Sequence, residues 1–142
     1  MAIFEGSQAS IAYAQVGAGP DIVWIGGGGD AGDSWDAYQI PHFRGSFRNT
    51  TFTNRGITPT KCRQPLPWTI ADMARYTADL IRGVCKPPVV VVGLSMGAGI
   101  VLQLALDAPE LVRVGIAMGT GTRSHGWLRY YMQAEIDFRT AG

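Results

Sequence analysis

The chain has 142 residues and a net charge of +1, with 12 basic and 11 acidic side chains. This balance excludes a strongly basic protein, so we expect neither a nucleic acid nor a membrane surface as a partner. The length fits one domain, residues 1–142, and is enough to bury a sizeable core. The first residues lack the basic and apolar regions of a signal peptide, so we expect a cytoplasmic protein.

Alternating strand and helix patterns run along the chain. Strands are expected at residues 2–5, 10–16, 21–25, 48–53, 88–92 and 112–118. Helices are expected at 34–40, 70–82 and 98–106, with a proline-containing loop at 57–68 and mixed helical character over 126–142. Thr69 and Asp72 predict a capping box at the start of the second helix. The alternation favours a parallel α/β sheet with right-handed crossovers and a ligand at the carboxyl ends of its strands.

The segment Gly93-Leu94-Ser95-Met96-Gly97 separates a run of valines from a helical stretch of small and apolar residues. A G-x-S-x-G between a strand and a helix is the nucleophile elbow, a sharp turn that holds its serine in strained geometry. Gly93 and Gly97 allow the backbone and the following helix to approach closely, and Ser95 projects from the end of the sheet. The helix start supplies N–H donors and a positive dipole end for a developing oxyanion. The motif predicts acyl transfer through a covalent ester on Ser95.

In this order, the elements resemble the α/β-hydrolase family, and within it the esterase, lactonase and haloperoxidase-like branch of bacterial hydrolases. The segments that carry the resemblance are the strand and glycine loop Val23–Asp30, the turn Phe52–Ile57, the helix start Trp68–Ala74, and the elbow with Ala105–Val112 behind it. The turn resembles the family's D-x-R-G, with Thr53 where aspartate is usual. The resemblance covers the N-terminal half of the family domain. It implies a mostly parallel sheet with flanking helices, truncated before the last strands and ending at the start of the lid region.

Carried over residue by residue, the resemblance assigns Ser95 as the nucleophile and the backbone N–H groups of Gly27 and Met96 as the oxyanion hole. It implies a small ester or lactone as the substrate. The glycine loop 26–29 has two other interpretations, a loose linker or a phosphate loop. A phosphate loop would need Gly-Lys-Ser/Thr, and a dinucleotide site would need G-x-G-x-x-G at a helix start; neither is cleanly present. A Rossmann-type nucleotide binder is therefore a weaker alternative.

The other members of a catalytic triad are not found in the sequence. In this family the order is serine, acid, histidine, and the chain ends before the positions of the last two. We therefore expect a fragment whose acid and base come from sequence beyond Gly142 or from a second chain. His42 is expected to be structural, whereas His125 follows the last strand and could approach Ser95. Asp30 and Asp33 are expected in solvated-loop or helix-cap roles.

The missing triad members favour a second, non-catalytic hypothesis, a hydrolase-like domain kept for binding or assembly through an open edge, whereas the intact elbow counts against it. The strand at 112–118 would lie at a sheet edge with an exposed apolar patch, so we expect self-association or a partner there. The spacing of Cys62 and Cys85 indicates neither a metal nor a disulfide, so we expect two reduced thiols, no metal and no cofactor.

The tryptophans are expected to pack in the core or the lid; they are Trp24, Trp35, Trp68 and Trp127.

Overall fold

The computed structural model describes residues 1–121 and 126–140, with the side chains of residues 127, 128 and 139 left out. Its strands are β1 (Ala2–Glu5), β2 (Ala9–Val16), β3 (Asp21–Ile25), β4 (Arg48–Phe52), β5 (Lys61–Cys62), β6 (Val89–Leu94) and β7 (Val112–Met118). Its helices are α1 (Gln39–Phe43), α2 (Ile70–Val84), α3 (Met96–Asp107) and α4 (Gly126–Thr140), with a short 3-10 turn at Pro109–Leu111.

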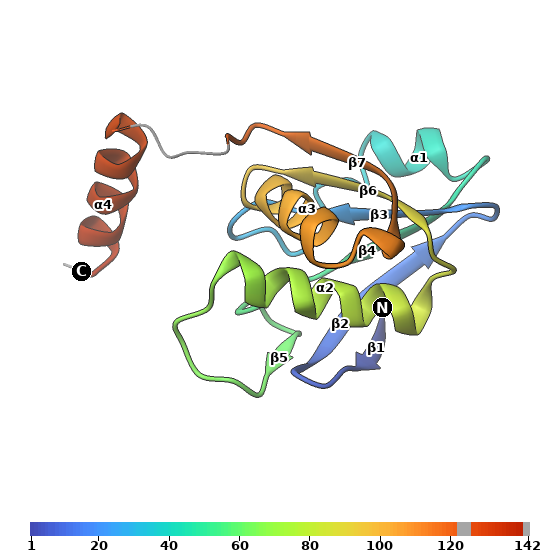
Figure 1. Ribbon diagram of the computed structural model, residues 1–142, viewed down its shortest axis with the longest axis horizontal. Coiled ribbons are helices and arrows are strands. Elements are labelled where there is room, and N and C mark those ends of the chain that lie inside the picture. Colours follow the sequence, from blue (N-terminus) through green and yellow to red (C-terminus); the bar gives the residue numbers. More distant parts are fainter. Residues whose placement is uncertain (122–125, 141–142) are drawn as a thin grey trace.

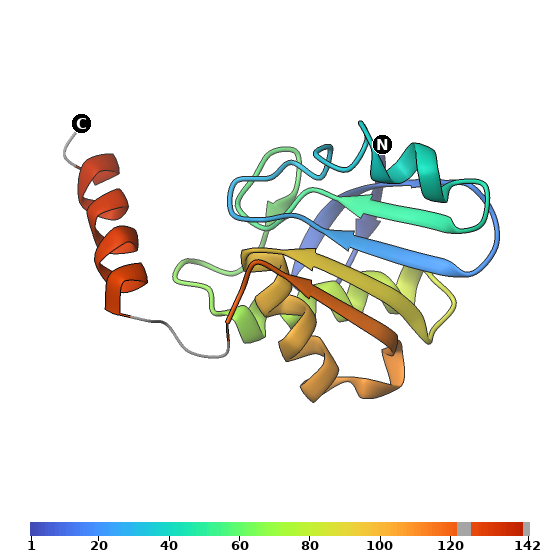
Figure 2. The same ribbon diagram turned by 90° about the horizontal axis from the view of Figure 1, so that it is seen from above.

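The strands form a single mixed sheet in the order β1-β2-β4-β3-β6-β7, with β5 paired to β2. Strands β4, β3, β6 and β7 run parallel to one another, and β1, β2 and β5 add antiparallel pairs. Helices α2 and α3 cover one face, α1 lies on the other, and α4 stands beyond the carboxyl ends of the parallel strands (Figures 1 and 2). This confirms the predicted α/β class with flanking helices.

Local sequence signals predicted several elements well. The strand predicted at 112–118 has the same bounds as β7, and the helix predicted at 70–82 extends to Val84 as α2. Its capping box is also confirmed, because the Asp72 N–H donates to Thr69 Oγ1 over 3.1 Å and the Thr69 N–H donates to Asp72 Oδ2 over 2.8 Å.

The helix expected at 34–40 is wrong in its extent, because residues 34–38 form turns and α1 begins only at Gln39. The cause is tertiary packing of Trp35, which is 4% exposed and lies against Trp24 with ring centroids 5.1 Å apart. The Ile40 N–H donates to the Trp35 carbonyl over 3.0 Å, a longer-range turn than that of an α-helix.

The expected loop at 57–68 is also corrected, since it contains β5. Lys61 and Cys62 pair with Ser10 and Ala9 of β2, and the N–H of Arg63 donates to the Gln8 carbonyl over 2.9 Å. A pairing of this kind depends on a strand far away in the sequence, and the prolines flank β5 without interrupting it.

Apolar side chains fill both faces of the sheet. The larger cluster, under α2 and α3, includes Val23, Ile25, Val91, Leu80 and Leu104. The smaller cluster, on the α1 side, consists of Ile22, Trp24, Trp35, Ile40 and Val92. The core therefore contains Trp24 and Trp35 as expected, Trp68 is half-buried, and the side chain of Trp127 lies outside the described residues.

The amino end of the sheet is held by an ion pair. Arg48 at the start of β4 donates to both carboxylate oxygens of Asp21 at the start of β3, over 2.6 and 2.8 Å. The Lys86 N–H donates to the same carboxylate over 2.8 Å, before β6 begins. Burial alone would raise the pKa of Asp21, but these hydrogen bonds and the neighbouring positive charges hold it below its usual value of 3.8.

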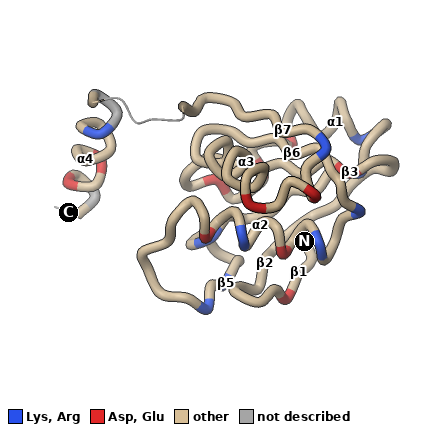
Figure 3. Tube along the Cα trace, in the orientation of Figure 1, with Lys and Arg blue, Asp and Glu red and all other residues tan. Residues whose placement is uncertain are grey.

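Charged residues of both signs are interspersed over the described part of the chain, as Figure 3 shows. This distribution agrees with the nearly balanced composition. Among the helices that the structure describes, none combines the length and the apolar character needed to cross a membrane.

The edge strand β7 leaves an apolar strip open. Val114 and Ile116 pair in register with Val90 and Val92 of β6, so they lie on the α1 face of the sheet, beyond the area that α1 covers. They are 48% and 43% exposed, and Met118 is 36% exposed. Within the described residues, β6 is the only strand paired with β7. An open edge beside apolar side chains is a surface prone to association.

We expect the 142-residue chain to self-associate through β7. Ile116→Lys should raise the monomer fraction, because burying a lysine charge against a second apolar strip is unfavourable. The measurement is size-exclusion chromatography with light scattering. Leu106→Lys is the control, since Leu106 is 77% exposed on α3 and lies outside the strip. A monodisperse monomer of the unsubstituted chain would contradict the expectation.

Candidate active site

Ser95 lies at the turn between β6 and α3 in strained geometry, with φ 55° and ψ −116°. Non-glycine residues rarely adopt a positive φ, and holding one there costs on the order of 1–3 kcal/mol. The Ser95 N–H donates to the Met118 carbonyl over 2.8 Å, and its own carbonyl accepts from the Ala98 N–H over 3.0 Å. The side chain is exposed. The turn therefore presents the hydroxyl to solvent at the carboxyl edge of the sheet.

Neither glycine of the elbow, Gly93 or Gly97, has room for a side chain. A Cβ at Gly97 would lie 2.3 Å from the Ile25 carbonyl oxygen and 2.6 Å from that of Gly26. A Cβ at Gly93 would lie 2.3 Å from the Gly97 carbonyl oxygen. All of these contacts are with backbone atoms, which cannot move aside as a flexible side chain could. The missing side chains let the first turn of α3 lie directly against the end of β3.

This contact brings the two residues named as oxyanion-hole donors to either side of Ser95. A Cβ placed on Gly27 would lie 3.5 Å from the Ser95 Cβ and 3.6 Å from the Leu94 carbonyl oxygen. Met96 is the first residue of α3, so its N–H belongs to the free amino end of that helix. Gly27 and Met96 are therefore the backbone neighbours of Ser95 at this turn, and their role as oxyanion-hole donors stays a prediction.

A hollow of about 520 Å³ opens above Ser95 and separates it from α4. On the sheet side it is lined by Gly28, Gly29, Ser95 and Met96, and on the α4 side by Tyr131, Met132, Glu135 and Ile136. Sequence analysis did not single out the α4 side chains. The spacing of Met132 and Ile136, one helical turn apart, was the available signal, but nothing local indicated which helix would face the elbow.

The remaining candidates do not gather at Ser95. His42 is exposed on α1, edge-on to Phe43, and α1 leads into the amino end of β4, away from the elbow (Figure 1). Asp30 accepts from the Gly32 N–H over 2.7 Å and also from the Ser34 hydroxyl, which is a loop role as expected. Asp33 is exposed, and His125 lies outside the described residues.

Neither the thiol of Cys85 nor the acidic residues that the structure describes form a second candidate site. Burial raises the pKa of Cys85 to about 11, and its Sγ lies 3.6 Å from Thr50 Oγ1, so the thiol stays protonated near neutral pH. Among residues 1–121 and 126–140, no three His, Cys, Asp or Glu side chains are grouped as metal ligands would be.

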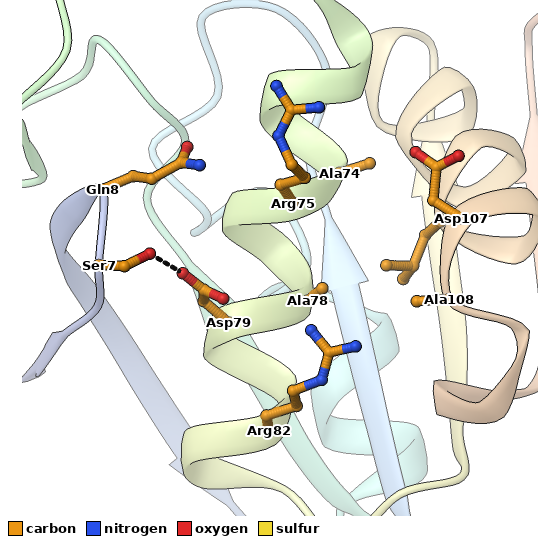
Figure 4. A pocket seen from close by; sticks show the side chains of 10 residues that line it. Ser7, Gln8, Ala74, Arg75, Ala78, Asp79, Arg82, Asp107 and Ala108 are labelled. Carbon is orange, nitrogen blue, oxygen red and sulfur yellow. Dashed lines mark hydrogen bonds between the residues drawn. The ribbon is translucent and has the colours of Figure 1, made fainter.

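A second hollow, of about 200 Å³, lies between α2 and α3 (Figure 4). Ser7 donates its hydroxyl hydrogen to Asp79 Oδ2 over 2.5 Å there. Arg75 and Arg82 border it, but they form ion pairs with Asp72 and Glu110. A serine hydroxyl bound to a carboxylate without a histidine or an oxyanion site is a surface contact, so the elbow remains the candidate site.

The chain is similar in sequence to known proteins. Residues 20–137 match the sequence model of the alpha/beta hydrolase fold. The chain is 37% identical over 134 residues, 94% of its length and 50% of the relative's, to "Putative non-heme bromoperoxidase BpoC" of Mycobacterium tuberculosis. It is 30% identical over 114 residues, 78% of its length and 41% of the relative's, to pyrrolizixenacetamide deacetylase of Xenorhabdus hominickii.

Among solved structures, that of Rv0554 from Mycobacterium tuberculosis superimposes with a TM-score of 0.90 at 34% identity. The match covers 99% of this chain and 53% of that one. The chain therefore spans about half the length of the relatives it matches.

The role of Gly97 can be tested by adding one methyl group. In an ordinary helix Gly→Ala is favourable by about 1 kcal/mol, but at Gly97 the added carbon meets two carbonyl oxygens. We expect Gly97→Ala to lower the free energy of unfolding by about 3 kcal/mol or more, measured by urea titration. Gly45→Ala is the control, since nothing lies within 4 Å of its Cβ position. Equal stability of the two variants would refute the close-approach argument.

Proposed function

The chain belongs to the alpha/beta hydrolase family, and on that premise we propose that it is the nucleophile-bearing part of a serine hydrolase. The substrate is a small ester or lactone, and the reaction passes through an acyl-enzyme on Ser95. The observation that carries the proposal is the left-handed backbone of Ser95. Strain of this kind persists only where the surrounding structure enforces it, and in a nucleophile elbow it exposes the attacking side chain.

The acyl-transfer step would proceed through the groups that flank Ser95. The Oγ attacks the carbonyl carbon of the substrate, its proton passes to a general base, and the carbonyl oxygen becomes an oxyanion. The N–H groups of Gly27 and Met96 would stabilise that oxyanion. The bond to the leaving oxygen then breaks, and that oxygen takes up the proton. The alcohol of an ester departs, whereas that of a lactone stays on the acyl chain, and in both cases an ester remains on Ser95. Water attacks this ester in the same way and releases the carboxylic acid.

The hollow above Ser95 supports a substrate with an apolar acyl or aryl group. Tyr131, Met132 and Ile136 contribute apolar surface on the α4 side, and about 520 Å³ is within the range of small-molecule sites. The name of the Xenorhabdus relative describes removal of an acetyl group, a reaction at an acyl carbon, which agrees with this reaction class.

The general base and its acid would come from outside residues 1–142. A serine hydroxyl is a weak nucleophile without a neighbouring base, and His42, the histidine that the structure describes, lies at the other end of the sheet. The relatives are about twice as long as this chain, so they have room for both residues outside the matched part.

Covalent labelling tests the nucleophile. In the protein produced from its own gene, we expect a fluorophosphonate to label Ser95 and add its phosphonyl group to that residue, as located by peptide mass spectrometry. Ser95→Ala should abolish labelling because it removes the attacking oxygen. Ser34→Ala is the control, since Ser34 is an exposed serine that bonds Asp30. Absence of labelling on Ser95 would overturn the proposed function.

The intact mass of the natural protein tests where the base comes from. We expect about twice the 15.2 kDa of this chain, because the chain covers half of its relative's length. A mass of 15.2 kDa would place the base on a second chain or nowhere, and hydrolysis by this chain alone would then be abandoned.

The second candidate is a non-catalytic domain that binds a ligand or partner. It is favoured by the open apolar edge of β7. The two candidates differ in one observable, since a binding domain would leave Ser95 unlabelled in the natural protein.

A further inference from the structure

The turn after β4 holds a buried polar side chain whose role the sequence did not reveal. Asn54 is 1% exposed, and its Nδ2 donates to the Gly26 carbonyl oxygen over 3.1 Å. Since that carbonyl can only accept, the amide must present its nitrogen to Gly26. Its Oδ1 is buried as well, and it has no hydrogen-bond partner among the described residues.

An unmet buried acceptor is unfavourable, and an apolar side chain of similar size would avoid it. The donor half of the amide must therefore supply something that an apolar residue would not. Gly26, the acceptor, is the first residue of the glycine loop and directly precedes Gly27, which lies beside Ser95. The contact thus links the end of β4 to the loop that carries a proposed oxyanion donor.

The geometry of the peptide bond converts this contact into control of the Gly27 N–H. The Gly26–Gly27 peptide is trans, and in a planar trans peptide the carbonyl oxygen and the following amide hydrogen point to opposite sides. Fixing the Gly26 carbonyl therefore fixes the direction of the Gly27 N–H. Glycine has no side chain to limit this peptide's rotation, so an external contact is needed to hold it.

The neighbouring residue ties the other end of the same loop. Thr53 Oγ1 donates to the Ala31 carbonyl over 2.8 Å. The Thr53 carbonyl accepts from the hydroxyls of Tyr76 and Thr60, each over 2.9 Å. The turn is thus anchored to α2 and to the segment before β5. Consecutive side chains on this anchored turn hold the loop 26–31 at both ends.

We infer that Asn54 is a positioning residue for the oxyanion hole, which orients the Gly27 N–H toward the oxyanion through its hydrogen bond to Gly26. This inference rests on the proposed acyl transfer at Ser95. Asn54 itself touches neither substrate nor nucleophile in this arrangement. Its effect should therefore appear in the rate of the covalent step and not in substrate affinity.

The test compares Asn54→Asp with Asn49→Asp in the protein produced from its own gene. Asn54→Asp keeps the shape but replaces the donor by an acceptor facing the Gly26 carbonyl. Asn49→Asp makes the same exchange at another buried amide, whose Nδ2 donates to the Phe47 carbonyl over 2.9 Å near the amino end of β4, and it leaves Gly26 untouched. The readouts are the second-order rate of fluorophosphonate labelling at Ser95, kcat and KM for a small activated ester, and thermal melting.

We expect Asn54→Asp to slow labelling and lower kcat by about 10- to 100-fold, with KM changed by less than about twofold. Asn49→Asp should keep the parent's rates while losing stability, because its contacts lie at the amino end of β4. If Asn54→Asp does not fold, Asn54→Ser replaces it, since the shorter hydroxyl cannot reach Gly26, and the same slowing is expected.

The possible results separate the inference from its premise. Parent-like labelling of a folded Asn54 variant, or equal slowing in Asn49→Asp at matched stability, overturns the positioning role and leaves the proposed function intact. Absence of labelling at Ser95 in the parent overturns the proposed function and the positioning role with it.

Discussion

The close approach of α3 to the end of β3 is the constraint on which the site depends. The first turn of α3 can lie against the carbonyl oxygens of Ile25 and Gly26 only because residue 97 has no side chain. That contact places Gly27 beside Ser95, while the hydrogen bond from the Ser95 N–H to the Met118 carbonyl joins β7 to the same point. The ends of β3, β6 and β7 therefore converge on one exposed hydroxyl, and any displacement of α3 would separate Ser95 from the glycine loop.

At the opposite end of the sheet, the contacts of Asp21 stabilise the central strands. Asp21, Arg48 and the Lys86 N–H join the starts of β3 and β4 to the segment before β6. Because the pKa of Asp21 is lowered, this contribution is present above the unfolded value of 3.8 and is lost as the pH falls through the lower folded value. The central strands are thus anchored at their amino ends, which leaves their carboxyl ends free to hold a strained serine.

The sequence was most informative where the determining contacts are local. The bounds of β7, the capping box of Thr69 and Asp72, and the strand–turn–helix context of Ser95 depend on neighbours in the chain. The turns at 34–38 could not be predicted because Trp35 packs on Trp24 of another strand, and β5 could not because its partners are Ala9 and Ser10. The role of Asn54 could not be predicted for the same reason, since its partner Gly26 directly follows a different strand, β3. Fold class follows from local pattern, whereas the support of a site depends on distant contacts.

The substitution of Thr53 for the aspartate usual in the family also has a physical reason. The Thr53 hydroxyl donates to the Ala31 carbonyl, and an ionised aspartate could only accept, so it would face that oxygen with a second acceptor. An aspartate here would need donors from the loop, such as backbone N–H groups, and hence a differently folded loop. The identity of residue 53 and the conformation of the glycine loop are therefore coupled.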